Sequence, residues 1–255
     1  MKLFCFGMGY VASHFANLPI WQTVHGTHRD DFPLNDALRA ALANATHILH
    51  SIPPNADISF DYEMKPKWFG YLSTTGVYGD LAGGWANEQT PTNPNNFRSQ
   101  QRVEAEQHWL QSGLPVNVYR LSGIYGPGRS AIDELNEGTA KRIYKENQFF
   151  SRIHVEDIVA VLQASMNIIG EVYNLADDKP APSYEVVEYA AKLMGIEPPP
   201  MVDFKDAELS PMARSFYSSS RRMENNKIKQ LLGGALKYPT YVEGLTGIFT
   251  NYKQI

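Results

Sequence analysis

The sequence predicts an α/β fold: a doubly wound parallel sheet with a small C-terminal α+β lobe. Short apolar strands alternate with helices along the first half of the chain, and a glycine turn follows the first of these strands. From Arg129 onward this alternation loosens into shorter elements. The 255 residues, 43% of them hydrophobic, are enough for one α/β domain with a small appended lobe. We therefore assign residues 1–128, with parts of the following chain, to the sheet domain, and about 129–255 to a lobe interleaved with the last sheet elements.

The amino-acid composition narrows the classes of protein to consider. A net charge of −4 argues against a nucleic-acid partner, and no uncharged apolar run is long enough to span a bilayer. Met1 to Phe6 enters the glycine turn too early for a signal peptide, so we expect a soluble, cytoplasmic protein. The only cysteine, Cys5, lies mid-strand, which favours a packed core thiol. A homodimer is one expectation for the oligomeric state, which composition leaves open.

The glycine turn, GMGYVA at 7–12, joins an apolar strand to a helix. Gly7 tolerates unusual dihedral angles, Gly9 has no Cβ to block a phosphate, and Ala12 lets helix and strand pack closely. The start of the helix adds N–H donors and a partial positive charge. A purely structural turn has the same pattern, but its place after the first strand favours a Rossmann-type dinucleotide site, with Met8 and Tyr10 among the cofactor contacts.

The end of the second predicted strand, at 23–27, indicates which dinucleotide binds. NAD sites usually place an acidic residue there to accept the ribose hydroxyls, whereas this chain has Thr27, His28 and Arg29. A guanidinium favours the 2′-phosphate of NADP through charge-assisted hydrogen bonds, so we expect NADP, with NAD as the alternative. The other interpretation is that Arg29 is a solvated loop residue, and the adjacent Asp30 and Asp31 keep it open.

The remaining elements follow from apolar periodicity, caps and proline breaks. We expect strands at 47–51, 68–72, 116–121 and 171–175, with a crossover of near-minimal length at 55–67. We expect helices from Asn35 or Asp36 to about 44, then at 97–111, 153–166 (with Asp157 near its start), 183–194 (with a Ser cap), 225–232 and 241–252.

Three hydroxyl residues end the strand at 68–72: Ser73, Thr74 and Thr75. Open α/β sheets bind their ligands at the carboxyl ends of their strands, so these hydroxyls are placed to hold a substrate oxygen. A polar strand end followed by a turn needs no ligand, and that alternative stays open. No motif in the sequence indicates a metal site.

Five segments carry further motifs, in this order: FGMGYVA at 6–12, YLSTTGVYG at 71–79, RLSGIYGPG at 120–128, IHVEDIV at 153–159, and the closing stretch 225–245. Together they resemble the extended short-chain dehydrogenase/reductase superfamily, the nucleoside-diphosphate-sugar epimerases and dehydratases, and within it a shorter, atypical branch. The resemblance implies a cofactor turn, an active-site strand end, a loop beside the nicotinamide and a C-terminal lobe that binds substrate. We accordingly add Ser51, Pro53 and Leu121 to the predicted cofactor contacts.

The resemblance ends at the proton shuttle. Members of this superfamily generally use a Tyr four residues before a Lys, and the matching positions here hold Arg98 and Arg102. Arginine does not deprotonate in proteins, so Arg98 cannot replace the Tyr as acid or base, although it could contact substrate. Arg102 could still hold the ribose hydroxyls and serve in the catalytic centre. The dehydratases also carry an Asp-Glu pair where Thr75 and Gly76 stand, which disfavours sugar dehydration.

The other candidate roles also follow from the resemblance. Thr74 matches the hydroxyl that hydrogen-bonds the reacting oxygen, and Tyr78 is a candidate catalytic phenol. We place Thr75, Tyr125 and Arg129 with Arg98 among the substrate contacts. Tyr78 and Tyr125 could instead be aromatic lids on their loops, and Arg129 could be a solvated cation.

Two functions remain. The leading hypothesis is an NADP-binding oxidoreductase or epimerase-like enzyme acting on a small molecule, possibly a nucleotide sugar, with a substituted proton donor. The alternative is a non-catalytic NADP-binding redox sensor or regulatory protein, and a scaffold that binds nothing is a weaker third.

Overall fold

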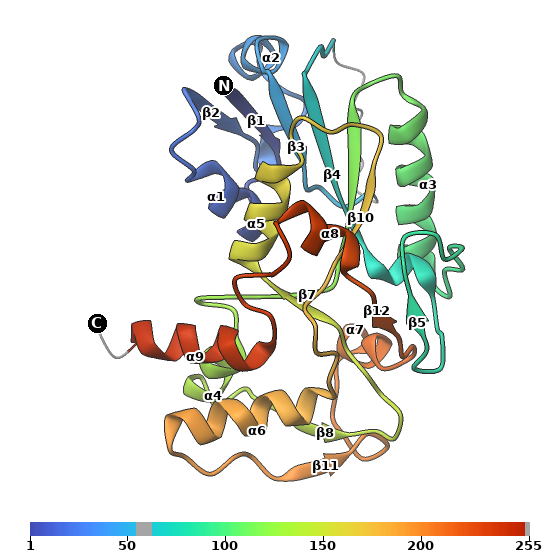
Figure 1. Ribbon diagram of the computed structural model, residues 1–255, viewed down its shortest axis with the longest axis vertical. Helices are drawn as coiled ribbons and strands as arrows, with labels where there is room; N and C mark the ends of the chain where they lie inside the picture. The colour runs from blue at the N-terminus through green and yellow to red at the C-terminus, as the bar shows by residue number, and fades with distance from the viewer. Residues whose placement is uncertain (55–62, 253–255) are drawn as a thin grey trace. The chain divides into compact units, whose positions relative to one another are not determined.

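The computed structural model describes residues 1–54 and 63–252, which form two compact units (Figure 1). Unit 1 comprises Met1–Val77, Pro94–Leu121 and Ile158–Tyr173, and unit 2 comprises Tyr78–Asn93, Ser122–Asp157 and Asn174–Ile255. Most of the predicted crossover at 55–67 lies outside the described residues. No helix in the described part of the chain is long and apolar enough to cross a membrane.

Unit 1 is built on the predicted doubly wound sheet. Its strand order is β10-β6-β4-β3-β1-β2, and the β1–β2, β1–β3, β3–β4 and β4–β6 pairs are parallel. The strands are β1 (Lys2–Phe6), β2 (Thr23–Gly26), β3 (His47–His50), β4 (Trp68–Thr74), β6 (Val116–Leu121) and β10 (Val172–Leu175). Because β2 and β3 flank β1 on opposite sides, the winding reverses at β1 and β3, which is where such sheets bind their ligands.

The helices of unit 1 begin where the sequence supplies caps. The side chains of Asn35 and Asn96 accept the backbone N–H groups of Leu38 and Ser99, each at 2.9 Å, and so start α2 and α3. The elements are α1 (Tyr10–Ala16), the 3₁₀ turn η1 (Arg29–Asp31), α2 (Asp36–Ala43), the 3₁₀ turn η2 (Thr75–Tyr78), α3 (Phe97–Gln111) and α5 (Val155–Ala164). The last residue of η2 and the first three of α5 belong to unit 2.

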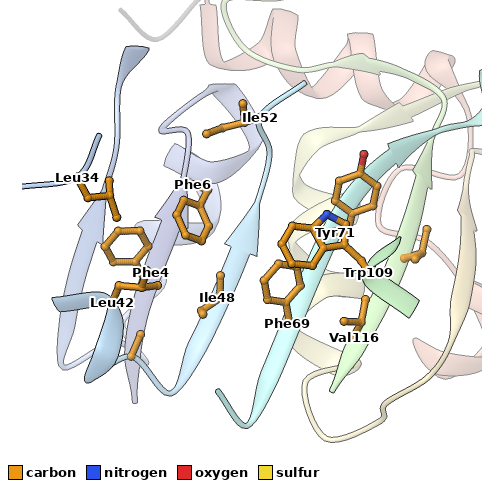
Figure 2. Packing of buried hydrophobic residues seen from close by; sticks show 12 residues of the cluster. Phe4, Phe6, Leu34, Leu42, Ile48, Ile52, Phe69, Tyr71, Trp109 and Val116 are labelled. Atoms are coloured by element: carbon orange, nitrogen blue, oxygen red, sulfur yellow. The ribbon is translucent and has the colours of Figure 1, made fainter. Parts of the chain in front are cut away.

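Both faces of the inner strands of the sheet are buried, as expected for parallel strands, whereas the edge strand β2 is mostly exposed. On one face, aromatic and aliphatic side chains from alternate strand positions pack against Trp109 of α3 and Leu42 of α2 (Figure 2). The strand residues of this cluster are Phe4, Phe6, Ile48, Phe69, Tyr71, Val116 and Val118. On the other face, Phe15 of α1 contacts the Trp68 ring at 5.8 Å, and Tyr119 shares a 2.6 Å hydrogen bond with Ser165.

Unit 2 consists of short elements. Three parallel two-stranded pairs join β5 (Trp85–Ala86) with β12 (Arg222–Met223), β7 (Gly123–Tyr125) with β9 (Arg152–His154), and β8 (Arg142–Tyr144) with β11 (Met201–Asp203). The helices are α4 (Ala131–Asn136), α6 (Ser183–Met194), α7 (Pro211–Phe216), α8 (Asn226–Leu231) and α9 (Tyr241–Tyr252). A core that includes Ile132, Ala190 and Leu245 joins α4, α6 and α9.

Two sequence predictions in unit 2 were wrong in detail. Ile153 and His154 are not helical, because the strand β9 pairs them with Ile124 and Tyr125 before α5 begins. Ser183 does not cap α6, because it is the first helical residue and Pro182 holds the cap position without a side-chain bond.

Candidate functional site

The glycine turn after β1 is tied to the ends of two neighbouring strands. Gly7 has φ +87° and donates its N–H to Thr27 Oγ1 at 2.9 Å, while the Met8 N–H donates to the Thr27 carbonyl at 2.9 Å. Ser51 Oγ donates to the Gly7 carbonyl at 2.6 Å. A Cβ on Gly7 would lie 2.9 Å from Ser51 Oγ, so glycine is required both by conformation and by space. The turn is therefore a fixed surface at the winding reversal.

Gly9 opens that surface to a ligand. Its backbone is extended (φ −82°, ψ −175°), and no heavy atom lies within 4 Å of the position that a Cβ would occupy. Ala12 is fully buried under the turn, and the Tyr10 ring packs on His14 with 4.6 Å between ring centroids. The position that a Cβ would occupy at Gly9 is thus open, which is what the predicted approach of a dinucleotide pyrophosphate requires.

Arg29 opens η1 at the end of β2 and is exposed. Of its two acidic neighbours, Asp31 is engaged locally, because its Oδ2 accepts the His28 N–H at 2.6 Å. Asp30 is exposed. The end of β2 therefore carries an exposed cation at Arg29, an exposed carboxylate at Asp30, and a carboxylate at Asp31 that is used within its own turn.

The other predicted cofactor contacts differ in exposure. Ser51 is half-buried and holds the turn, as described above, and Pro53 is exposed. Leu121 is buried at the end of β6, where its carbonyl accepts a hydrogen bond from Thr75 Oγ1 at 3.4 Å. Thr75, a predicted substrate contact, therefore points into unit 1.

Thr74 ends β4 and is half-buried. Its Oγ1 accepts the Gly76 N–H at 3.1 Å, which fixes the hydroxyl oxygen, and its own O–H meets no acceptor among the described residues. Thr74 therefore keeps one hydrogen-bond donor that could serve a ligand oxygen.

Sequence analysis missed a buried ionic network behind this strand end. Ser73 Oγ donates to Glu106 Oε1 at 2.5 Å, and Arg120 Nη2 donates to Glu106 Oε2 at 2.7 Å, with all three side chains buried. Two signals could have found it. Arg120 is a charge inside an otherwise apolar strand, and Glu106 lies one helical turn after Arg102.

The two arginines of α3 do not form a pair. Arg102 Nη1 donates to the Leu72 carbonyl at 2.7 Å and to Tyr71 Oη at 3.3 Å, which binds its guanidinium to β4. Arg98 is exposed at the first turn of the helix. The spacing of four places both on one helix face, but only Arg102 reaches the sheet.

His50 lies in the aromatic cluster of unit 1, with its ring 5.4 Å from Tyr71 and 5.2 Å from Trp109. Burial, reinforced by the charge of Arg102, lowers its pKa to about 3. The imidazole is therefore neutral at physiological pH and lies within the core.

The predicted tyrosines and Arg129 belong to unit 2. Tyr78 is fully buried and donates its hydroxyl to Asn174 Oδ1 at 2.8 Å. Tyr125 is also buried, and desolvation together with the Asp177 charge raises the pKa of its phenol. Arg129 is exposed on a turn in which its backbone N–H and carbonyl bond the carbonyl and N–H of Gly126. In unit 2, the two phenols are thus packed as core side chains.

No group of three or more metal-binding side chains gathers anywhere in the described ranges.

Comparison with known proteins gives relatives at two levels of similarity. No protein-family model matches the chain. A functionally unknown conserved protein from Silicibacter pomeroyi DSS, whose structure is solved, is 41% identical, with 99% of each chain covered and a TM-score of 0.84. Protein YeeZ of Escherichia coli (strain K12) is 30% identical over 177 residues, or 66% of this chain. The chain spans 58% of the length of that curated relative.

More distant solved structures share the fold. A dTDP-glucose 4,6-dehydratase from Bacillus anthracis in complex with NAD is 20% identical, with a TM-score of 0.73 and 100% and 97% of the two chains covered. A human epimerase family protein with NADPH is 16% identical, with a TM-score of 0.78 and 98% and 100% covered. Structures with this fold thus bind either nicotinamide dinucleotide. The chain therefore belongs to one family with the protein from Silicibacter pomeroyi, and it shares its fold with these dehydratase and epimerase structures.

Proposed function

We propose that unit 1 binds NADP(H), with its pyrophosphate against the turn from Gly7 to Gly9. The observation that carries this proposal is the open position at Gly9, beside a turn that hydrogen bonds hold to β2 and β3. A pyrophosphate needs a close approach to backbone N–H groups, and a side chain at Gly9 would fill the space it requires. The residues present therefore fit a dinucleotide.

The choice of NADP over NAD rests on Arg29. An exposed guanidinium at the end of β2 provides planar, charge-assisted donors for a 2′-phosphate. An NAD site would need a carboxylate there for the ribose hydroxyls; Asp31 is already bonded to His28, and the exposed Asp30 is the carboxylate that keeps NAD as the alternative.

The enzyme hypothesis is favoured by Thr74. Its remaining O–H donor could bind the oxygen of a substrate alcohol or carbonyl, while the free N–H groups of Arg102 hold ribose hydroxyls. The bound nicotinamide would supply or accept a hydride. In this proposal the exposed Arg98 is a cationic contact that unit 1 offers to a small molecule such as a nucleotide sugar. Unit 2, taken by itself, is the substrate lobe that the resemblance implies, with exposed Arg129 as its candidate cation.

The sensor hypothesis is favoured by the shuttle positions. Neither Arg98 nor Arg102 can exchange a proton near neutral pH, and the phenols of Tyr78 and Tyr125 are buried. A protein of this kind would bind NADPH without consuming it.

Gly9→Val tests the cofactor site. The backbone at Gly9 suits any residue and the added side chain meets open space, so the melting temperature of the free protein should stay unchanged. NADPH binding, measured by calorimetry, should weaken on the order of tenfold or more. Ala43→Val, which enlarges an exposed residue at the end of α2, is the control and should bind normally. Unchanged NADPH affinity in Gly9→Val would refute the proposed site.

Thr74→Val separates the two functions. Wild type is supplied with NADPH and a panel of nucleotide sugars and small ketones, and loss of reduced nicotinamide is followed by absorbance. An enzyme should show turnover that Thr74→Val abolishes without loss of NADPH affinity. A sensor should bind NADPH and consume none in either form.

A further inference from the structure

Arg222, on β12 of unit 2, lies among aromatic side chains. Its Cζ lies 4.1 Å from the centroid of the Phe149 ring and 5.7 Å from that of Trp85. Its Nε is buried without a partner, and no acceptor for its side-chain N–H groups occurs in the part of the chain that the structure describes. The Trp85 side chain is 51% exposed. A partly buried guanidinium thus lies beside an exposed indole.

Other arginines that lie over rings in this chain are bonded differently. Arg214 lies 4.9 Å from the Phe204 ring and donates to the Ala207 carbonyl at 2.7 Å. Arg152 lies 5.9 Å from Tyr241 and donates to the carbonyls of Phe150 and Ala181. In these cases a backbone carbonyl compensates the guanidinium. At Arg222 the buried Nε–H has lost its water and meets no protein acceptor among the described residues, which is unfavourable for a charged donor.

The backbone around Arg222 holds this arrangement in place. β12 pairs with β5 so that Arg222 faces Trp85, and the Arg222 N–H donates to the Gly84 carbonyl at 2.8 Å (Figure 1). The Phe149 N–H donates to Ser220 Oγ at 3.0 Å, and Ser220 N–H donates to Asp80 Oδ1 at 2.8 Å. The guanidinium is therefore positioned before any ligand arrives, which reduces the entropy lost on binding.

The charges near this position favour an anion. No carboxylate oxygen of the described residues lies within ion-pair distance of Arg222. The adjacent Arg221 is also cationic, donates to the Gly79 carbonyl at 2.9 Å and has Asp80 as its nearby opposite charge. A planar fork of N–H donors matches phosphate or carboxylate oxygens, and an exposed indole matches a flat ring.

We propose that Arg222, Phe149 and Trp85 form a subsite in unit 2 for an oxyanion carried on a ring. The oxyanion accepts the Arg222 N–H groups, including the buried Nε–H, and the ring lies against Trp85. Where unit 2 is the substrate lobe of the proposed function, this subsite makes the substrate an anionic ring compound. The subsite itself needs no cofactor, so it can be tested apart from NADP binding.

The probes are phenyl phosphate, benzoate and inorganic phosphate, titrated without cofactor and followed by calorimetry and tryptophan fluorescence. Phenyl phosphate should bind more tightly than inorganic phosphate, because only the former has a ring for Trp85. Comparing phenyl phosphate with benzoate distinguishes a phosphate from a carboxylate as the preferred oxyanion. Trp85→Phe should remove the fluorescence change and weaken phenyl phosphate toward inorganic phosphate.

Arg222→Gln should weaken phenyl phosphate about tenfold or more, as expected for a charge-assisted bond. Arg222→Lys keeps the charge and the stem but not the fork, and should bind with intermediate affinity. Arg214→Gln, which removes a ring-stacked guanidinium with a carbonyl partner, should bind as wild type. The proposed subsite would be overturned by any of three results. Wild type and both Arg222 variants bind phenyl phosphate equally, Arg214→Gln weakens phenyl phosphate as much as Arg222→Gln does, or wild type binds none of the probes. Gly9→Val should bind these probes normally even if the proposed NADP site is correct.

Discussion

The two units use their buried polar groups differently. At the strand ends of unit 1 these groups bind one another: Thr27 and Ser51 hold the glycine turn, and Ser73 and Arg120 both bind Glu106. Unit 2 buries polar atoms that have no partner among the described residues, namely Arg222 Nε, Asp177 Oδ2, Asn174 Nδ2 and Ser122 Oγ; in unit 1, Trp68 Nε1 is such an atom, at the other end of β4 from the ligand-binding strand ends. The glycine turn of unit 1 is thus a finished surface that presents backbone to a ligand, whereas unit 2 retains side-chain groups that a ligand or water could satisfy.

The units also differ in how pH acts on them. Unit 1 buries a histidine whose pKa is lowered to about 3, and unit 2 buries an aspartate, Asp177, whose pKa is raised to about 7. Acid therefore opposes the native state of unit 1 through His50, and alkali opposes that of unit 2 through Asp177. The predictions below test this contrast, from the largest expected effect to the smallest.

Breaking the ionic network of unit 1 should have the largest effect. Glu106→Gln leaves the Arg120 charge buried without its partner, which typically costs about 3–5 kcal/mol of unfolding free energy. Glu104→Gln, on the exposed face of the same helix, is the control and should cost no more than about 0.5 kcal/mol. Urea denaturation measures both. Equal stability of the two variants would mean that the network contributes nothing, and the contrast between the units would fail.

Asp177→Asn tests unit 2. Burial raises the Asp177 pKa, with Asp178 and Asp157 adding to the effect and Arg152 opposing it. Between the ordinary aspartate pKa of 3.8 and about 7 the native state binds more protons than the unfolded state, so stability falls as pH rises through this window. At pH 8 the asparagine variant should be more stable by at most about 4 kcal/mol, at about 1.4 kcal/mol per pKa unit. His50 acts in the opposite sense over part of this range, so the variant is compared with wild type at each pH: its urea midpoint relative to wild type should rise from pH 4 to pH 8. A difference that does not change with pH would contradict the assignment.

His50→Leu tests unit 1 in the opposite direction. The native pKa lies below the unfolded value of 6.5, so the unfolded state binds the extra proton and stability falls as pH drops from 6.5 toward 3. Asp177 acts in the opposite sense, so the test is the difference between the two proteins: from neutral pH to pH 4, wild type should lose about 3 kcal/mol relative to the leucine variant. His108, exposed on α3, offers the control His108→Leu, whose difference from wild type should not change with pH. A difference between wild type and His50→Leu that is the same at every pH would place the titrating group elsewhere.

Sequence reasoning succeeded where local signals set the structure. Proline and glycine breaks and apolar runs placed α3 at 97–111 and β6 at 116–121, and the glycines placed the turn of unit 1. It failed where distant contacts decide. His154 enters a strand because Tyr125 pairs with it, and the Glu106–Arg120 bond joins residues on different elements. The environment of Arg222 depends on rings at 85 and 149, which no sequence spacing relates.

Arg29→Ala tests whether unit 1 recognises its cofactor through more than backbone. The proposed pyrophosphate site consists of a glycine turn and the hydroxyls that hold it, so Arg29 is the side chain at the end of β2 that would distinguish a 2′-phosphate. Removing it should raise the NADPH dissociation constant about tenfold, the usual scale for a charge-assisted bond, and leave NADH binding unchanged. Lys67→Ala removes a positive charge just before β4, at the amino ends of the strands, and should change the affinity for neither NADPH nor NADH. If Arg29→Ala kept the wild-type ratio of NADPH to NADH affinity, recognition in unit 1 would be by backbone alone, and the cofactor would be chosen without the guanidinium.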